Sequence, residues 1–177
     1  MDWGAHLIDQ LLLLYNSPVT SIHCHMTNLA FDTCDDGFQL HLLFEGGQTA
    51  SVYVGTAHSV SPPRWLVFGE KGSMTINDWE SDGKLVVRPP VPVFDGKPPV
   101  FYGKAGPTIT MAPQSAPEEE IIITEEPSYE GYYVNFADAM DGKCMPEVMM
   151  SQVYRVMQII DAAYHSHKTG TAVLGSF

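Results

Sequence analysis

The segment Ser21-Ile22-His23-Cys24-His25-Met26-Thr27 alternates strictly between apolar and polar side chains. A period of two predicts a β-strand that buries one face and exposes the other. The segments Phe38–Phe44 and Thr49–Ala57 repeat this alternation, with turn-forming residues at Asp35-Asp36-Gly37 and Glu45-Gly46-Gly47. Because the linkers between these segments are short, they favour antiparallel pairing. The stretch from Ser21 to Ala57 therefore predicts an antiparallel sheet.

Helical periodicity flanks this sheet at both ends of the chain. Residues from about Asp2 to Tyr15 carry an apolar stripe formed by Ile8, Leu11, Leu12 and Tyr15. Near the C-terminus, two stripes predict two further helices: Tyr133, Phe136, Ala137 and Met140, then Val153, Val156, Met157, Ile160 and Tyr164. Ser151 is the expected N-cap of the last helix and Gly170 its expected end. The predicted fold is α+β, an open and mainly antiparallel sheet with helices packed on one face.

The middle of the chain predicts weaker structure. Segments Arg64–Phe68 and Ser73–Ile76 predict a hairpin around Glu70-Lys71-Gly72. Residues 79–127 form a proline-rich, acidic excursion, in which Leu85–Val87 and Ile121–Ile123 are short strand candidates. The acidic run from Glu118 is interpreted as a solvated loop. Val173 and Leu174 predict a final edge strand, and residues 1–177 are expected to form a single domain.

Composition excludes several classes of partner. The 177 residues contain 21 acidic and 9 basic residues, a net charge of −12 that argues against nucleic-acid binding. Three cysteines without regular spacing indicate a reducing compartment rather than a disulfide framework. The apolar run Leu11–Leu14 is too short to span a membrane, and the N-terminus lacks the basic region of a signal peptide. The expected location is cytoplasmic, with no membrane contact.

The polar face of the predicted sheet is unusual because it lacks lysine and glutamate. Its expected members are Ser21, His23, His25, Thr27, His41, Thr49, Ser51 and Tyr53. Depletion of charge with retention of histidine and tyrosine is typical of a face that meets another subunit, so a homo-oligomer is expected; a merely solvated face is the alternative. The histidines also suit a metal, but no fourth ligand is evident, so no metal site is predicted unless a partner subunit supplies ligands.

The first predicted helix carries the candidate catalytic residues. Asp2, His6 and Asp9 are spaced i, i+4 and i+7, which places them on one helix face. A carboxylate one turn from an imidazole can orient it as a general base. Asp2 and His6 are therefore predicted to be catalytic, while Asp9 is a structural or substrate-binding candidate. A helix-start acid beside an incidental surface histidine is the alternative.

Read together, three segments resemble the C-terminal domain of the Gfo/Idh/MocA oxidoreductases, the relatives of glucose-fructose oxidoreductase and inositol dehydrogenase. They are Asp2-Trp3-Gly4-Ala5-His6-Leu7-Ile8-Asp9, Phe68-Gly69-Glu70-Lys71-Gly72-Ser73-Met74, and the pair Asn135–Met140 with Arg155–Tyr164. The resemblance covers nearly the whole chain. It implies an enzyme with an N-terminal Rossmann domain for NAD or NADP and a C-terminal domain that binds a sugar or polyol. It also implies that His6 handles the proton of the substrate hydroxyl and that Asp2 tunes His6.

The chain lacks the sequence motifs of the family's N-terminal cofactor-binding half. It has no Gly-x-Gly-x-x-Gly motif and no Glu-Lys-Pro motif for the family's catalytic lysine. We therefore expect the chain to be one domain of a longer enzyme, to bind no cofactor by itself and to be inactive alone. His58, and Arg64 after Pro62-Pro63, are candidate substrate contacts. A stand-alone binding or assembly module, and an NAD-dependent glycosidase of the same family, are the alternatives.

Overall fold

The computed structural model describes residues 2–30, 33–79, 82–87, 100–103, 106–109, 118–122 and 130–177, but not the side chains of Asp2 or of residues 100–122. The chain divides into two compact units, residues 1–59 with 128–177, and residues 60–127. Each unit is described by itself. Within the described residues, no helix combines the length and apolarity needed to cross a membrane.

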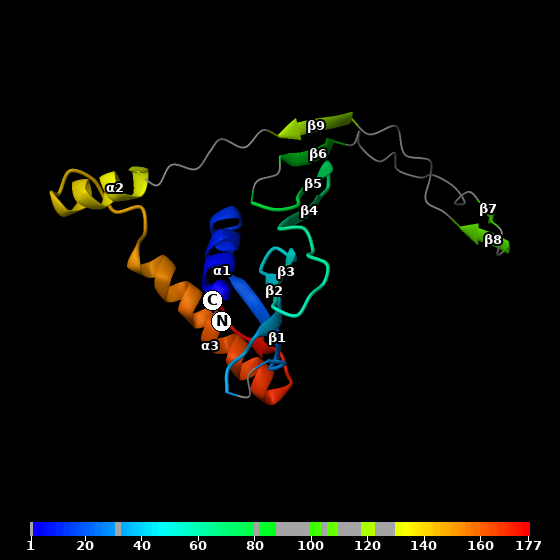
Figure 1. Cartoon of the computed structure of the whole chain (residues 1–177), viewed down its shortest axis with the longest axis horizontal. Coiled ribbons are helices and arrows are strands. Elements are labelled where there is room, and N and C mark those ends of the chain that lie inside the picture. Colours follow the sequence, from blue (N-terminus) through cyan, green and yellow to red (C-terminus); the bar gives the residue numbers. More distant parts are fainter. Residues whose placement is uncertain are drawn as a thin grey trace. The chain divides into compact units, whose positions relative to one another are not determined.

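The first unit is built on the predicted antiparallel sheet (Figure 1). Strands β1 (Val19–Thr27), β2 (Gly37–Phe44) and β3 (Thr49–Gly55) pair in order, and β10 (Val173–Leu174) adds to the other edge of β1. The register places His23 opposite His41, and His41 opposite Ser51. The alternation of burial along β1 and β2 confirms the strand prediction and its inward face. The predicted final edge strand is also confirmed.

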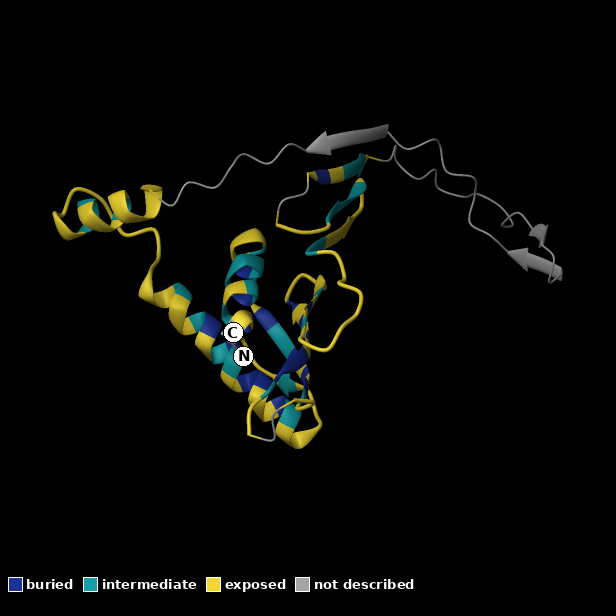
Figure 2. Ribbon diagram, viewed as in Figure 1, coloured by how far each residue is buried: buried dark blue, intermediate teal, exposed yellow. Residues whose placement is uncertain are grey.

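Two helices cover the inward face of this sheet and close its core. Helix α1 (Asp2–Leu14) packs against α3 and β3, and α3 (Met150–Thr169) packs along β1. The core consists of buried side chains from both layers, among them Ile8, Leu12, Ile22, Leu40 and Ile159. Figure 2 shows these buried residues in dark blue on α1, α3 and the sheet. The fold is therefore α+β with helices on one sheet face, as predicted.

The two C-terminal helices differ in detail from the prediction. Helix α2 (Glu130–Met140) contains no buried residue, and Tyr133 and Met140 of its predicted stripe are 69% and 75% exposed. In α3, the buried positions are Val156, Ile159, Ala162, Ala163 and Ser166, whereas Val153, Met157 and Tyr164 of the predicted stripe are exposed. The periodicity identified both helices. In α3, apolar residues on both sides of the helix concealed which side faces the sheet, whereas α2 buries neither side.

The two ends of α3 are capped in different ways. Met149, not Ser151, is the N-cap, and the Gln152 side chain accepts a hydrogen bond from the Met149 backbone N–H at 2.7 Å. Gly170 ends the helix as predicted, with φ of 69° in the left-handed region that glycine adopts without steric cost. The prediction of Ser151 was wrong because the N-cap here uses the backbone of Met149 and the side chain of Gln152, not a serine hydroxyl.

The second unit contains a separate antiparallel sheet in the order β4 (Trp65–Gly69), β5 (Gly72–Ile76), β6 (Gly83–Val87) and β9 (Glu118–Ile122). The hairpin β4–β5 is confirmed, with Gly69 opposite Gly72. A Cβ at Gly72 would lie 2.4 Å from the Val86 carbonyl oxygen, so this close strand approach requires glycine. The described part of residues 79–127 also includes a small hairpin, β7 (Val100–Gly103) with β8 (Gly106–Ile109).

One part of the predicted acidic loop is a strand. Glu118, Glu119 and Glu120 belong to β9 and stand opposite Val87, Val86 and Leu85 of β6. The expectation of a solvated loop is therefore wrong for these three residues. Because glutamate is depleted in strands, three consecutive glutamates favoured a loop in the prediction. Pairing with the apolar strand β6 overrides that preference here.

Candidate functional site

Helix α1 presents His6 on its solvent side. Ile8 and Leu12 of the same helix are buried in the core, which fixes the rotation of α1 about its axis. His6 is exposed and Asp9 is half-buried. Asp2 is the first residue of α1, one turn before His6, and its side chain lies outside the described residues. An imidazole held on an anchored helix and open to solvent can accept a proton from a molecule that docks there.

Arg155 of α3 holds the end of α1 in place. Its Nη1 donates a hydrogen bond to Asn16 Oδ1 at 2.8 Å, and its Nη2 donates to the Ser17 carbonyl oxygen. Both acceptors follow the last turn of α1, in the connection to β1. Partial burial lowers the pKa of Arg155 from its usual value. The Arg155 guanidinium thus links α3 to the C-terminal end of α1, the helix that carries His6.

A shallow hollow lies at one end of the outward sheet face, with a volume of about 390 Å³ that includes open solvent. His58 follows β3, its ring stacks on Tyr53 with centroids 5.0 Å apart, and its Nε2 is hydrogen-bonded to the Tyr53 hydroxyl. Asp36 is buried beside the hollow, where its carboxylate accepts hydrogen bonds from the backbone N–H groups of Leu29 and Ala30. The hollow is therefore lined by aromatic rings and a carboxylate that is already engaged.

The structure does not bring all of the predicted site residues together. His6 and Asp9 belong to α1, which packs on the inward side of the sheet. His58 stacks on Tyr53, which belongs to the outward side. Arg64 belongs to the other unit, where its guanidinium carbon lies 3.3 Å from the centroid of the Trp79 ring and burial lowers its pKa. His6 and Asp9 share one element, whereas His58 lies across the sheet from them.

The histidines of the outward face are arranged in pairs. His23 stands opposite His41, whose Nδ1 lies 2.9 Å from Ser51 Oγ. The rings of His25 and His167 meet edge to face with centroids 5.7 Å apart. Across the residues that the structure describes, no three histidine, cysteine or acidic side chains cluster as metal ligands. Among the described residues, these pairs do not form a complete ligand set from one chain.

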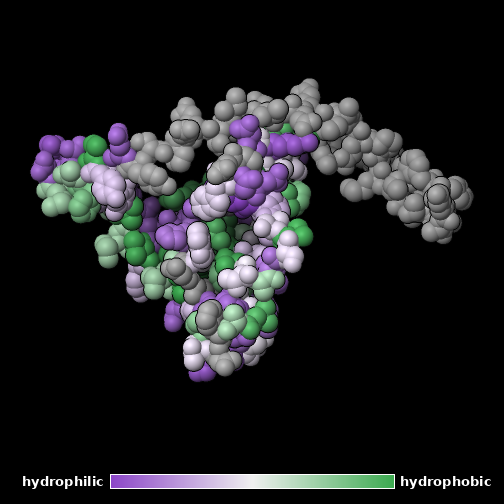
Figure 3. All heavy atoms as spheres, in the orientation of Figure 1, coloured by the Kyte–Doolittle hydropathy of each residue, from purple (hydrophilic) through white to green (hydrophobic). Residues whose placement is uncertain are grey.

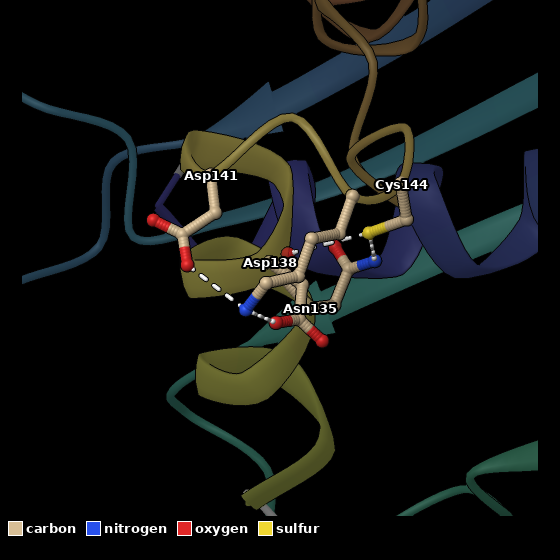
Figure 4. Close-up of polar contacts among 5 residues, drawn as sticks. Asn135, Asp138, Asp141 and Cys144 are labelled. Atoms are coloured by element: carbon tan, nitrogen blue, oxygen red, sulfur yellow. Dashed lines mark hydrogen bonds and ion pairs between the residues drawn. The ribbon is translucent and has the colours of Figure 1, made fainter.

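A second polar cluster organises the loop between α2 and α3 (Figure 4). Asn135 Oδ1 accepts a hydrogen bond from the Glu147 backbone N–H at 2.9 Å, and Asn135 Nδ2 donates to the Met145 carbonyl oxygen at 3.3 Å. Cys144 lies against the same amide, with its Sγ 3.6 Å from Asn135 Nδ2. The exposed Lys143 ammonium bridges Asp138 and Asp141. No pattern in the sequence predicts this cluster, whose hydrogen bonds hold the turn before α3.

Comparisons with known proteins found one family model and several similar proteins. Residues 1–75 match the family model described as the GFO/IDH/MocA C-terminal domain. The chain is 28% identical over 177 residues to scyllo-inositol 2-dehydrogenase (NADP(+)) IolW of Bacillus subtilis strain 168, covering 98% of this chain and 48% of the relative. An NAD-binding protein from Listeria innocua has a crystal structure that is similar with a TM-score of 0.82 and 34% identity, over 99% of this chain and 51% of that one.

A more distant structure shares the fold alone. The WlbA dehydrogenase from Bordetella pertussis, crystallised with NADH and UDP-GlcNAcA, is 17% identical with a TM-score of 0.57, over 99% of this chain and 44% of that one. The chain thus spans about half the length of the relatives that it matches.

Proposed function

We propose that the chain belongs to the C-terminal domains of the Gfo/Idh/MocA oxidoreductases and forms the substrate-binding half of an NAD(P)-dependent enzyme that oxidises a hydroxyl group of a sugar or polyol. The observation that carries this proposal is the exposed His6 on α1, a helix whose opposite side is anchored in the core. The similarity of nearly the whole chain to an inositol dehydrogenase supports the class of substrate.

The sequence of this chain contains no Gly-x-Gly-x-x-Gly motif for a dinucleotide. A pyrophosphate needs glycines at a helix N-terminus so that the backbone can approach it closely. Helix α1 begins with Asp2-Trp3-Gly4, α2 with Glu130-Gly131 and α3 with Met150-Ser151, so each of these described helices has at most one glycine in its first turn. We therefore assign NAD or NADP to an N-terminal Rossmann domain in the remainder of the whole protein. When bound there, the nicotinamide supplies the acceptor for the hydride.

The part of the reaction that falls to this chain is the handling of the proton. His6 accepts the proton of the substrate hydroxyl as the C–H bond of the same carbon breaks. Asp2, one helical turn earlier, stabilises the imidazolium that forms. Asp9 lies on the same helix and contacts a further hydroxyl of the substrate. Because His58 lies on the other side of the sheet, the proposal rests on these three residues; contact of Arg64 with substrate stays a prediction.

The test is made in the full-length protein that contains this chain. We expect His6→Gln to lower kcat by about 10²-fold to 10⁴-fold, the usual contribution of a general base, with a much smaller change in KM. His165→Gln is the matched control, because His165 is an exposed histidine on α3. Turnover of inositols and aldoses with NAD and with NADP is measured for both variants. Unchanged turnover in His6→Gln would show that the proposed role of His6 is wrong.

We also propose that the outward face of the first sheet joins copies of the chain into a homo-oligomer. The support is chemical: the outward positions of β1, β2 and β3 carry no aspartate, glutamate, lysine or arginine. Charge depletion is typical of the centre of protein interfaces, whereas solvated sheet faces usually carry charges. Sedimentation equilibrium of the 177-residue chain at pH 8 tests this, and a monomer at micromolar concentration contradicts it.

A further inference from the structure

The outward face of the first sheet differs from the rest of the chain in its response to acid. The whole chain carries a net charge of −12, which opposes the approach of a second copy. At neutral pH, the outward positions of β1, β2 and β3 contribute nothing to that charge. Their titratable members are mainly histidines, and imidazole is the side chain that changes charge between about pH 5 and 8.

The geometry concentrates these histidines at neighbouring positions. His23 and His41 stand directly opposite each other on adjacent strands. The other titratable groups on this side are His25 on β1, Tyr53 on β3, His58 after β3, and His167 on α3 against His25. The acids described next to the ends of β2 are Asp36, which is buried and bonded to backbone N–H groups, and Glu45, which is exposed. No aspartate or glutamate stands at the described strand positions opposite His23 and His41.

From this arrangement we propose that the His23–His41 pair makes self-association through the outward face dependent on pH, with a second copy bound at neutral pH and released in mild acid. The inference rests on the proposed homo-oligomer. With both imidazoles neutral, the face is polar but uncharged and can be covered by its own copy. Protonation places like charges directly opposite each other on one sheet, and the contact would bury them without partners.

The experiment measures self-association of the 177-residue chain from pH 8.0 to pH 6.0 by sedimentation equilibrium, with EDTA present so that no metal links imidazoles. Over this range carboxylates stay ionised, so histidines dominate the change in charge. We expect the dissociation constant of the wild-type chain to rise about tenfold or more as two facing charges are buried in each copy. The double variant His23→Gln/His41→Gln keeps polarity without titrating, and it should associate equally at both pH values.

The control variant is His165→Gln, which removes one exposed histidine from α3 and should keep the wild-type pH dependence. His167 is not used, because its Nδ1 accepts a hydrogen bond from the Met26 backbone N–H and so belongs to the fold. Circular dichroism at each pH establishes that every variant is folded.

The outcomes separate the two proposals. A wild-type chain that is monomeric at pH 8.0 overturns the homo-oligomer, and the pH dependence with it. A wild-type chain that associates equally at pH 8.0 and pH 6.0 overturns only the pH dependence. Release that merely accompanies loss of the folded spectrum also overturns the pH dependence. If the double variant does not fold, the wild-type profile still decides, since it requires no substitution.

Discussion

Ser166 is fully buried, and its hydroxyl serves two elements at once. Its Oγ accepts a hydrogen bond from the Cys24 backbone N–H of β1 at 3.0 Å and donates one to the Thr171 carbonyl oxygen at 2.7 Å. We expect Ser166→Ala to lower the free energy of unfolding by about 1–3 kcal/mol, because the Cys24 N–H loses its partner in the interior and the Thr171 carbonyl loses a second hydrogen bond. Urea unfolding monitored by circular dichroism measures the change.

The control for this prediction is Ser151→Ala, the same chemical change at an exposed position of the same helix. It should shift the free energy of unfolding by no more than about 0.5 kcal/mol. Equal effects of the two substitutions would contradict the role given to the Ser166 hydroxyl.

Cys24 differs from the other two cysteines in its reactivity. It is 2% exposed, and burial, with a smaller contribution from the negative charge of Asp35, raises its pKa to about 11. The native thiol is therefore protonated at pH 8, where thiolates are the reactive species. We expect iodoacetamide at pH 8 to modify the exposed Cys34 and Cys144 in the native chain, and Cys24 only after unfolding. Mass spectrometry of the labelled peptides checks this; rapid native labelling of Cys24 would contradict it.

At the scale of elements, the link between α3 and the end of α1 depends on one arginine. Arg155→Gln removes a guanidinium that bonds both Asn16 and Ser17, groups nearly 140 residues away in sequence. We expect a loss of about 1–3 kcal/mol in the free energy of unfolding, because a charge-assisted pair of hydrogen bonds is lost. In the full-length protein, the same substitution should lower kcat, since the helix that carries His6 is less well held.

Lys143→Gln provides the comparison for Arg155→Gln. Lys143 also bonds two groups, but these are exposed aspartates, and exposed ion pairs contribute little to stability. Its urea midpoint should therefore match that of the wild-type chain. An equal loss for Lys143→Gln and Arg155→Gln would contradict the assigned anchoring role.

The sequence predicted elements better than it predicted their contacts. Alternation along Ser21–Thr27 and Phe38–Phe44 predicted two strands and their inward faces, because a period of two leaves only one apolar side. Helices α2 and α3 were identified, but apolar residues such as Phe136 and Met157 lie on exposed sides. Figure 3 shows hydrophobic residues at the surface of α2 and the start of α3. Sequence periodicity cannot tell a core stripe from an apolar stripe that stays uncovered in this chain.

For the candidate site, the sequence identified residues by type and spacing but missed those that act through long-range contacts. His6 and Asp2 are predicted site residues because they lie one turn apart on one helix, and this assignment stays a prediction. Ser166 and Arg155 were missed, since their partners lie more than 130 residues away and no local pattern signals such pairs. Asp36 was interpreted as a turn residue, and its buried carboxylate was not foreseen.

At the scale of the whole molecule, the two units differ in how they are stabilised. Every buried hydrophobic side chain among the described residues belongs to the first unit, while Phe68 of β4 is 76% exposed. We expect backbone amides of β5 to exchange with solvent at least roughly a hundredfold faster than those of β2, because regions with few buried apolar contacts open locally. The comparison is matched, since both strands are flanked by a partner on each side. Hydrogen exchange measured by mass spectrometry tests this prediction. Equal protection of the β5 and β2 amides would contradict it.

The side chains that finish β1 have a consequence for how the first sheet can grow. Strand β10 covers only Ser21 and Ile22, and beyond it Ser166 and His167 bond the N–H groups of Cys24 and Met26. Gly175 and Phe177 bond Thr20 and Val19 on the same side, so this margin of the sheet is closed by the C-terminal residues and by α3. Within the described residues of that sheet, β3 is the last strand on the other side. Polymerisation through strand pairing needs two open margins per molecule. A molecule with one closed margin can pair with only one other molecule in this way. Edge-to-edge addition through this sheet therefore stops at a pair of molecules and cannot extend into a fibre.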